Sequence, residues 1–245
     1  MRTAYSGISG RIGRYIDEYR STDSELLDRS IFNWEDSSTY KSLNSYDRVF
    51  LSFPVNKINV LKLLPKFLPT LRPDQTIVKF GSLGPQHIIH DLIDAELRTR
   101  CRVINLRLAP TMQNIMDEQI EGEYLCDYRY GRPAPYVAPE DAAALAVKAV
   151  ESTVAGDDLA VTGTENLTIR DVQTLLKRYR HYQIKNIVPG AFVDQYRAYG
   201  KDLVQQIADA YESYKTWNPE PSSDLADNEI YPLTFEQWLE KHYDN

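Results

Sequence analysis

Hydrophobic positions in the first half of the chain alternate between short runs and longer segments with helical spacing. The short runs are typical of buried strands and lie at 3–6, 47–54, 76–80 and 102–106. The segments with helical spacing lie between them, at 12–19, 58–68 and 86–100. Strands that alternate with helices predict a parallel sheet with right-handed crossovers, whose ligands sit at the carboxyl ends of the strands.

The segment between the first predicted helix and the next predicted strand is too short to hold a further strand. Residues 20–24 form a polar break after the first helix, and residues 30–34 are interpreted as a short strand. The roughly ten residues between Tyr19 and Ile31 leave little room for a strand and its connection. The sheet is therefore expected to lack its second strand.

The second half has a different pattern. It predicts helices at 115–120, 142–154 and 168–179, strands at 159–163 and 183–188, and a loop at 124–135. Aromatic and apolar residues then follow one helix face from Tyr196 and Tyr199 to Tyr214, with a break at Gly200. This stripe is interpreted as core packing or, alternatively, as the wall of a substrate pocket. We expect a nucleotide-binding type of domain at 1–120, to which 136–165 returns, and a mainly helical substrate region at 166–245.

A glycine turn follows the first strand and opens the first helix. It reads Gly7-Ile8-Ser9-Gly10-Arg11-Ile12-Gly13. The first glycine allows a tight turn, the second lets a phosphate approach the backbone, and the third lets the helix and the strand pack closely. The turn predicts a phosphate site made by Gly7, Ser9, Gly10, Arg11, Ile12 and Gly13, although a glycine-rich loop before an ordinary helix has the same pattern. Other strand ends at the same edge are Phe53-Pro54, Gly81-Ser82 and 107–114. Of these residues, Phe53, Pro54 and Gly81 are further candidates for binding the cofactor.

Composition and charge exclude several classes of partner. The net charge is −7, and residues 201–245, with 10 acidic and 3 basic side chains, account for all of it. The absence of a basic stripe argues against nucleic acid and anionic membranes as partners. No apolar run reaches the ~18 residues of a membrane span, and no signal or transit peptide is visible. Cys101 and Cys126 are interpreted as reduced thiols. A cytoplasmic protein with a small-molecule ligand, either a monomer or a small homo-oligomer, fits these features.

Several motifs together resemble the NmrA-like branch of the atypical short-chain dehydrogenase/reductases. The resemblance covers nearly the whole chain and rests on segments 7–13, 47–54, 78–84, 107–114, 135–141, 162–168 and 234–238. It implies an α/β fold with a Rossmann-type, doubly wound parallel sheet that binds NADP or NAD, and a smaller C-terminal substrate domain. Some members of this family reduce quinones and other small molecules with NADPH, and others bind the dinucleotide as a redox signal without chemistry.

Two departures from the family affect the functional interpretation. With no second strand there is no evident residue to read the adenosine ribose, so the dinucleotide is expected to bind weakly, differently or not at all. The Tyr-x-x-x-Lys pair of ordinary short-chain dehydrogenases is also missing after Ser82. His90 is the candidate acid or base, Asp94 one turn later is placed to orient it, and Ser82 is a candidate hydrogen-bond donor. The alternative is that the histidines of this helix are surface or cap residues, and Lys79 is interpreted as structural.

Three hypotheses follow from these residues. The first is an NAD(P)H-dependent reductase of a carbonyl or quinone-like compound. The second is a cofactor-independent isomerase, dehydratase or cyclase that uses His90, Asp94 and Ser82. The third is a non-catalytic regulator that senses the dinucleotide. In the two enzyme hypotheses, the candidate substrate-binding residues are Asn114, Tyr136, Tyr196 and Tyr199.

Overall fold

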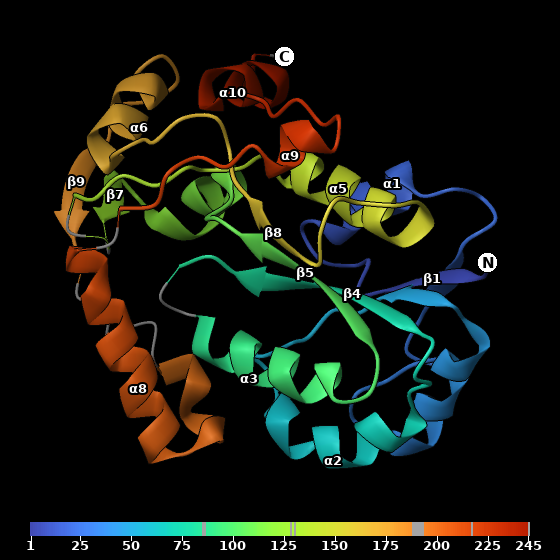
Figure 1. Ribbon diagram of the computed structural model, residues 1–245. Helices are drawn as coiled ribbons and strands as arrows, with labels where there is room; N and C mark the ends of the chain where they lie inside the picture. Colours follow the sequence, from blue (N-terminus) through green and yellow to red (C-terminus); the bar gives the residue numbers. More distant parts are fainter. Residues whose placement is uncertain (85–86, 128, 130, 188–193, 217, 245) are drawn as a thin grey trace.

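A parallel sheet of six strands forms the centre of the molecule (Figure 1). The computed structural model describes residues 1–84, 87–127, 129, 131–187, 194–216 and 218–244. The strands are, in their order across the sheet, β2 (Glu25–Leu27), β1 (Thr3–Ser6), β3 (Arg48–Phe50), β4 (Thr76–Ser82), β5 (Arg102–Leu108) and β8 (Asp158–Val161). The predicted α/β class and parallel sheet are confirmed, and β8 shows that the second half of the chain returns to this sheet.

The predicted absence of a second strand is wrong. Strand β2 pairs in parallel with β1, so that Leu26 lies opposite Tyr5. Its three residues, of which only Leu27 is buried, are too few to show a hydrophobic period. Residues 30–34, which were expected to form a strand, form turns with an isolated bridge at Asn33. Doubly wound sheets place a further strand outside the second one, and within the described residues this outer strand is absent. The chain instead runs from β2 through the 3-10 helix η1 (Ser37–Ser45) to β3.

One face of the sheet packs against its covering helices through a mainly apolar layer. Helices α1 (Gly13–Tyr19) and α5 (Pro139–Glu151) lie together on it, with the short α9 (Asp224–Asp227) beside β8. Helix α5 turns a row of buried alanines toward the sheet, and these small side chains allow close packing against Val78, Ile104 and Leu106. The apolar runs of β4 and β5 are explained by burial on both faces.

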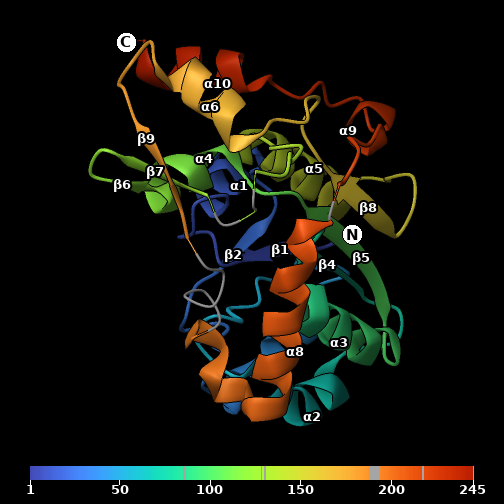
Figure 2. The same ribbon diagram turned by 90° about the vertical axis from the view of Figure 1, so that its left-hand side faces the viewer.

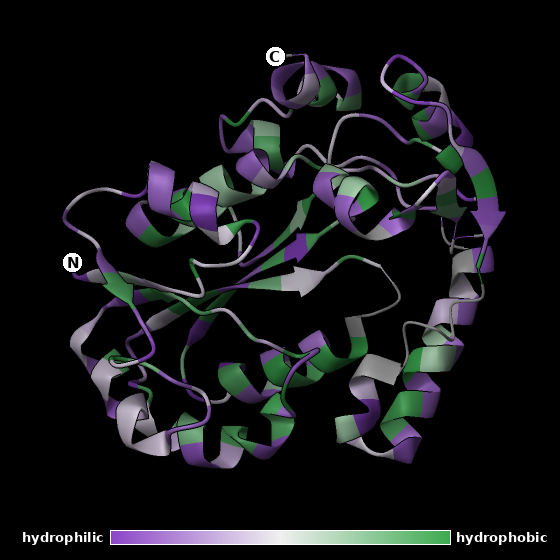
Figure 3. Ribbon diagram, turned by 180° about the vertical axis from the view of Figure 1, so that it is seen from behind, coloured by the Kyte–Doolittle hydropathy of each residue, from purple (hydrophilic) through white to green (hydrophobic). Residues whose placement is uncertain are grey.

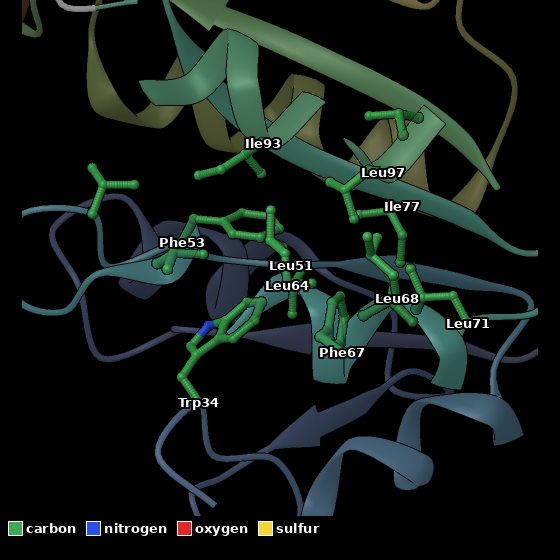
Figure 4. Close-up of a cluster of buried hydrophobic side chains, with 14 of the residues drawn as sticks. Trp34, Leu51, Phe53, Leu64, Phe67, Leu68, Leu71, Ile77, Ile93 and Leu97 are labelled. Carbon is green, nitrogen blue, oxygen red and sulfur yellow. The ribbon is translucent and has the colours of Figure 1, made fainter. Parts of the chain in front are cut away.

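The other face packs against α2 (Leu64–Phe67), α3 (His87–Arg98) and the 3-10 helices η2 (Val60–Lys62) and η3 (Leu68–Thr70). Figure 4 shows Leu51 and Ile77 of the sheet side against Ile93 and Leu97 of α3, with Trp34 and Phe67 below them. The helices of this layer carry both green and purple segments in Figure 3, as amphipathic helices over a core do.

A second, smaller layer lies beyond β8. Its three-stranded sheet contains β6 (Ile120–Glu121), β7 (Tyr124–Asp127) and β9 (Gln183–Asn186), and α6 (Ile169–Leu176) and α10 (Phe235–Tyr243) share its core (Figure 2). Strand β7 lies inside the segment 124–135 that was expected to be a loop. Its few apolar positions are set among polar and aromatic residues, so the sequence lacks a clear alternation there.

The aromatic stripe near the C-terminus forms two helices rather than one. The 3-10 helix η5 (Asp194–Tyr199) and helix α8 (Lys201–Glu212) meet at Gly200, whose φ of +91° confirms the predicted break. The short η6 (Ser213–Lys215) follows. Tyr196, Ile207 and Tyr211 are buried in the core shared with α2 and α3, so this stripe packs as core. In the described part of the chain, none of the helices has the length and apolarity needed to cross a membrane.

Candidate functional site

A cavity of about 410 Å³ opens where β1, β4 and β5 end. Three segments that are distant in the sequence form its walls. They are the glycine turn after β1, the end of β4 together with α3, and the end of β5 with α4 (Met112–Asn114). Phe50, Phe80 and Ile16 add apolar surface. The cavity therefore lies where the alternation of strands and helices predicts a ligand.

The glycine turn forms the first wall, and the space around two of its glycines, Gly7 and Gly13, admits no side chain. Gly7 has a φ of +71°, and a Cβ on it would lie 2.3 Å from the Cβ of Ser52. A Cβ on Gly13 would lie 2.5 Å from the carbonyl oxygens of Gly7 and Ile8. Gly7, Gly10, Arg11, Ile12 and Gly13 all line the cavity, whereas Ser9 belongs to the turn without lining it.

Arg11 connects this wall to the third one. Its Nη1 donates a hydrogen bond of 3.0 Å to Oδ1 of Asn114, and its Nε lies 3.4 Å from a carboxylate oxygen of Asp117. The same Asn114 oxygen accepts a hydrogen bond of 2.8 Å from the hydroxyl of Thr111. Asn114, predicted to bind substrate, is thus held at the cavity wall in contact with the glycine turn.

The second wall brings together Gly81, Ser82 and His90. Ser82 ends β4, and His90 lies in the first turns of α3, whose apolar row Ile89, Ile93 and Leu97 fixes the helix against the sheet. Both polar side chains are half-buried. A hydroxyl and an imidazole therefore line the same cavity.

Asp94 does not orient His90. Its carboxylate lies 2.9 Å from Nε of Arg98 and 3.6 Å from Nζ of Lys79, a lysine with no solvent exposure. Position 94 is one turn from His90 on the helix, but the two cations draw the carboxylate toward the sheet. The expected His90–Asp94 pair is therefore corrected to an Asp94 that pairs with Lys79 and Arg98.

These residues belong to a closed polar ring under the sheet, which comprises Lys79, Asp94, Arg98, Asn105 and Asp158. Lys79 donates to Oδ1 of Asn105 at 2.9 Å, Asn105 donates to Asp158 at 3.2 Å, and Arg98 contacts Asp158 at 2.9 Å. Burial lowers the pKa of Lys79, and the nearby charge of Asp94 opposes this shift. The structural interpretation of Lys79 agrees with this placement, while the ring itself has no signal in the sequence because its members come from four separate elements.

Several predicted site residues lie away from the cavity. Phe53 packs against Trp34, with ring centroids 5.0 Å apart, and Pro54 follows it outside the cavity. Tyr136 is buried in the smaller layer, where Arg129 lies over its ring and hydrogen-bonds its hydroxyl. Tyr196 is buried in the core, and the Tyr199 hydroxyl donates to the carbonyl of Ile58 at 2.9 Å.

Two candidate residues for the adenosine ribose were missed by sequence reasoning. Asp28 and Arg29 directly follow β2, and both are exposed. An acid at the end of this strand pairs with a ribose 2′-hydroxyl, and a nearby arginine accommodates a 2′-phosphate. One oxygen of Asp28 accepts hydrogen bonds from Ser30 and Ile31, and these bonds lower the pKa of Asp28. Neither residue lines the cavity.

Comparison with known proteins links this geometry to a group of solved structures. No family model matches the chain, and no curated protein sequence matches it. The structure is similar to that of an NADPH-dependent quinone oxidoreductase from Escherichia coli, solved in complex with NADPH, with a TM-score of 0.75 over 99% of this chain and 100% of that one at 13% identity. The chain has a Rossmann-like fold.

Two further structures support the same fold. A triphenylmethane reductase from Citrobacter sp., complexed with NADP(H), aligns with a TM-score of 0.70 at 10% identity and covers 98% of this chain and 99% of its own. A nucleoside-diphosphate-sugar epimerase from Staphylococcus aureus aligns with a TM-score of 0.70 at 12% identity, with the same coverage. Because the alignments span almost the full length of each chain, the smaller layer is part of the shared architecture.

Proposed function

We propose that this protein is an NmrA-like reductase that uses NADPH or NADH to reduce a carbonyl or quinone-like group of a small organic compound. The observation that carries the proposal is one cavity in which the glycine turn meets Ser82, His90 and Asn114. The quinone oxidoreductase and the triphenylmethane reductase with the same fold are proteins solved with NADPH and NADP(H).

The residues of the glycine turn fit a dinucleotide phosphate. At Gly7 and Gly13, a side chain would collide with the atoms that shape the turn, so the backbone stays open toward the cavity. Arg11 adds a cation at the same wall. We assign the phosphate contacts to this turn, Gly81 to the wall nearest the reactive end, and the ribose to Asp28 and Arg29.

When bound, the nicotinamide supplies the hydride that reduces the acceptor. In our proposal the Ser82 hydroxyl donates a hydrogen bond to the acceptor oxygen, and the His90 imidazole delivers the proton that this oxygen gains. Asn114 positions the acceptor from the third wall, and Phe50, Phe80 and Leu108 exclude water from it. Asp94 has a supporting role through α3.

A second candidate function follows from the extent of the cavity. It includes His90 and Ser82 but neither Asp28 nor Arg29, the two residues directly after β2, so the cavity covers the reactive end and not the adenosine end. A cofactor-independent isomerase, dehydratase or cyclase would need only the reactive end, with His90 as the base.

The deciding experiment is a calorimetric titration with NADPH and NADH, followed by a screen of quinone and carbonyl acceptors. We expect saturable binding and oxidation of the bound nucleotide. Gly7→Ala should weaken binding at least about tenfold, because its Cβ would meet Ser52. Gly131→Ala is the matched control, since its φ of +74° imposes the same backbone strain of about 1 kcal/mol away from the cavity.

Each outcome of this titration separates the hypotheses. Binding with turnover supports the reductase. Binding without turnover of any acceptor would favour a dinucleotide sensor. If neither nucleotide binds at millimolar concentration, the reductase proposal is wrong and the cofactor-independent enzyme replaces it.

A further inference from the structure

The side-chain amide of Asn114 is held in one orientation by two neighbours at the cavity. Its Oδ1 accepts a hydrogen bond of 3.0 Å from Nη1 of Arg11 and one of 2.8 Å from the hydroxyl of Thr111. A guanidinium carries N–H donors and no acceptor, so the amide atom that faces Arg11 is the oxygen and not the nitrogen. These two partners therefore decide which end of the amide is left for a ligand.

The two partners are themselves fixed. The Nε of Arg11 lies 3.4 Å from a carboxylate oxygen of Asp117. Thr111 is buried directly before α4, and its backbone carbonyl accepts a 3.0 Å hydrogen bond from the backbone N–H of Asn114. Thr111 and Asn114 are thus joined through both their backbones and their side chains, which sets the hydroxyl relative to the amide.

The nitrogen end of the same amide is turned to no protein group. Among the residues that the structure describes, none accepts a hydrogen bond from Nδ2 of Asn114, while Asn114, Thr111 and Arg11 all line the cavity. An amide that gives its oxygen to the protein leaves its N–H donors to a ligand. Asn114 therefore offers the cavity a donor and not an acceptor.

The rest of the lining has the same polarity. Ser82 and His90 act as donors to the acceptor oxygen in the proposed reaction, and among the described residues that line the cavity there is no Asp or Glu. The lining therefore has no anionic group to receive a cation or an N–H donor of the substrate. A ligand that matches it carries acceptor oxygens at two places and no positive charge.

We infer that Thr111 is a positioning residue that fixes Asn114 as a hydrogen-bond donor, and that the acceptor carries two carbonyl oxygens. This inference rests on the proposed reductase function and narrows its substrate class to quinones and diketones. One carbonyl is reduced at Ser82 and His90, and the oxygen of the other accepts a hydrogen bond from Nδ2 of Asn114. The second oxygen orients the compound in the cavity.

The test uses pairs of acceptors that differ in one carbonyl, namely 1,4-cyclohexanedione with cyclohexanone and 1-phenyl-1,2-propanedione with 1-phenyl-2-propanone. The readout for the purified full chain is the ratio of kcat/KM for the dione to kcat/KM for the monoketone, in which changes in nucleotide binding cancel. Asn114→Asp keeps an oxygen for Arg11 and Thr111 but replaces the N–H donors with a second oxygen. The ratio should therefore fall about tenfold for at least one pair.

Thr111 is tested by the same ratio. Thr111→Val removes one of the two hydrogen bonds that hold the amide and should lower the ratio about two- to fivefold, and Thr111→Ser should restore it. A purely structural role of Thr111 would lower kcat/KM for both members of a pair alike, and this result would overturn its positioning role. Asn186→Asp on the exposed strand β9 makes the same change of side chain away from the cavity and should leave the ratio unchanged.

An NMR measurement separates this inference from the reductase proposal. The side-chain amide resonance of Asn114, identified by its absence from Asn114→Asp, should shift when 1,4-cyclohexanedione is added without nucleotide, and cyclohexanone should shift it less. If diones and monoketones are reduced with the same ratio in the wild type and in Asn114→Asp, the inference is overturned while the reductase stands. If no acceptor is reduced but the dione still shifts this resonance, the reductase fails and the donor site remains. If no acceptor is reduced and the resonance does not move, both are wrong.

Discussion

The two faces of the central sheet bury charge in opposite ways. On the face covered by α1 and α5, apolar side chains fill the layer, and a buried carboxyl, Asp141, enters at the start of α5. On the face covered by α3, five polar side chains close a ring in which two cations meet two carboxylates. The two faces therefore have different roles beside the cavity. The apolar face supplies stability, whereas the ring fixes α3, and thereby His90, beside the cavity.

The largest expected effect comes from breaking the ring. Asp94→Ala leaves the fully buried Lys79 with Asn105 as its remaining partner in the ring. Removal of one member of a buried pair costs about 3–5 kcal/mol, so we expect a loss of that size in the free energy of unfolding measured in urea. Lys79→Met removes the cation instead and should cost about 1 kcal/mol, because Asp94 keeps Arg98.

The control for the ring is an exposed pair. Asp157→Ala removes a partner of Arg102 at the surface and should cost less than about 1 kcal/mol. If Asp94→Ala were as mild as Asp157→Ala, the ring would not fix α3, and the contrast between the two faces would disappear.

The second largest expected effect is the pH dependence of stability that Asp141, the buried carboxyl at the start of α5, causes. Burial raises the pKa of Asp141 to about 6, although a hydrogen bond from the backbone N–H of Leu233 partly offsets this. Below pH 4 the group is protonated in both the folded and the unfolded chain. Between about pH 4 and pH 6 the unfolded chain releases its proton while the folded chain keeps it, so the protein loses stability, by at most about 3 kcal/mol, and the loss is complete above pH 6.

Asp141→Asn removes this titration. Its Tm should match the wild type near pH 4 and exceed it at pH 7.5, and the surface variant Asp202→Asn should follow the wild type at both pH values. Equal Tm values for Asp141→Asn and the wild type at pH 7.5 would contradict a buried, destabilising carboxylate. The neighbouring Glu140 behaves differently. Burial raises its pKa, but hydrogen bonds from His242 and Lys241 outweigh this and lower it.

The smallest effect links the ring to the cavity. A Cβ on Gly81 would lie 2.5 Å from Oδ1 of Asn105, so Gly81→Ala displaces the side chain that accepts the Lys79 hydrogen bond. Overpacking of this kind costs about 1–3 kcal/mol in unfolding free energy. In an Asn105→Ala background the same change should cost much less. An equal cost in both backgrounds would show that the two positions are independent.

The sequence predicted the fold wherever an element is long enough to show a period. Strands β4 and β5 and helix α3 were predicted from their apolar spacing. The three glycines at 7, 10 and 13 indicated the turn that forms the first wall of the cavity. Strand β2 was missed because three residues at a sheet edge carry no repeat. The residues after it, Asp28 and Arg29, were missed for the same reason.

The site was predicted in part because strand ends in a parallel sheet converge. Gly81, Ser82, His90 and Asn114 meet the glycine turn at one cavity, as their positions at strand and helix ends suggested. The partners of side chains could not be predicted in this way. A helical spacing brings Asp94 near His90 but carries no information on Lys79 in the strand below, and an aromatic stripe has the same period whether it lines a pocket or fills a core.

The ring also has a consequence for the order in which the molecule is made. Asp158 is 60 residues from Arg98 and 53 from Asn105 along the chain. During synthesis, the segment with Lys79, Asp94, Arg98 and Asn105 leaves the ribosome well before β8 does. Until Asp158 is synthesised, the ring contains two cations, Lys79 and Arg98, and one acid, Asp94. The pairing of β8 therefore completes the hydrogen bonding of the sheet and the charge balance of the ring in one late step.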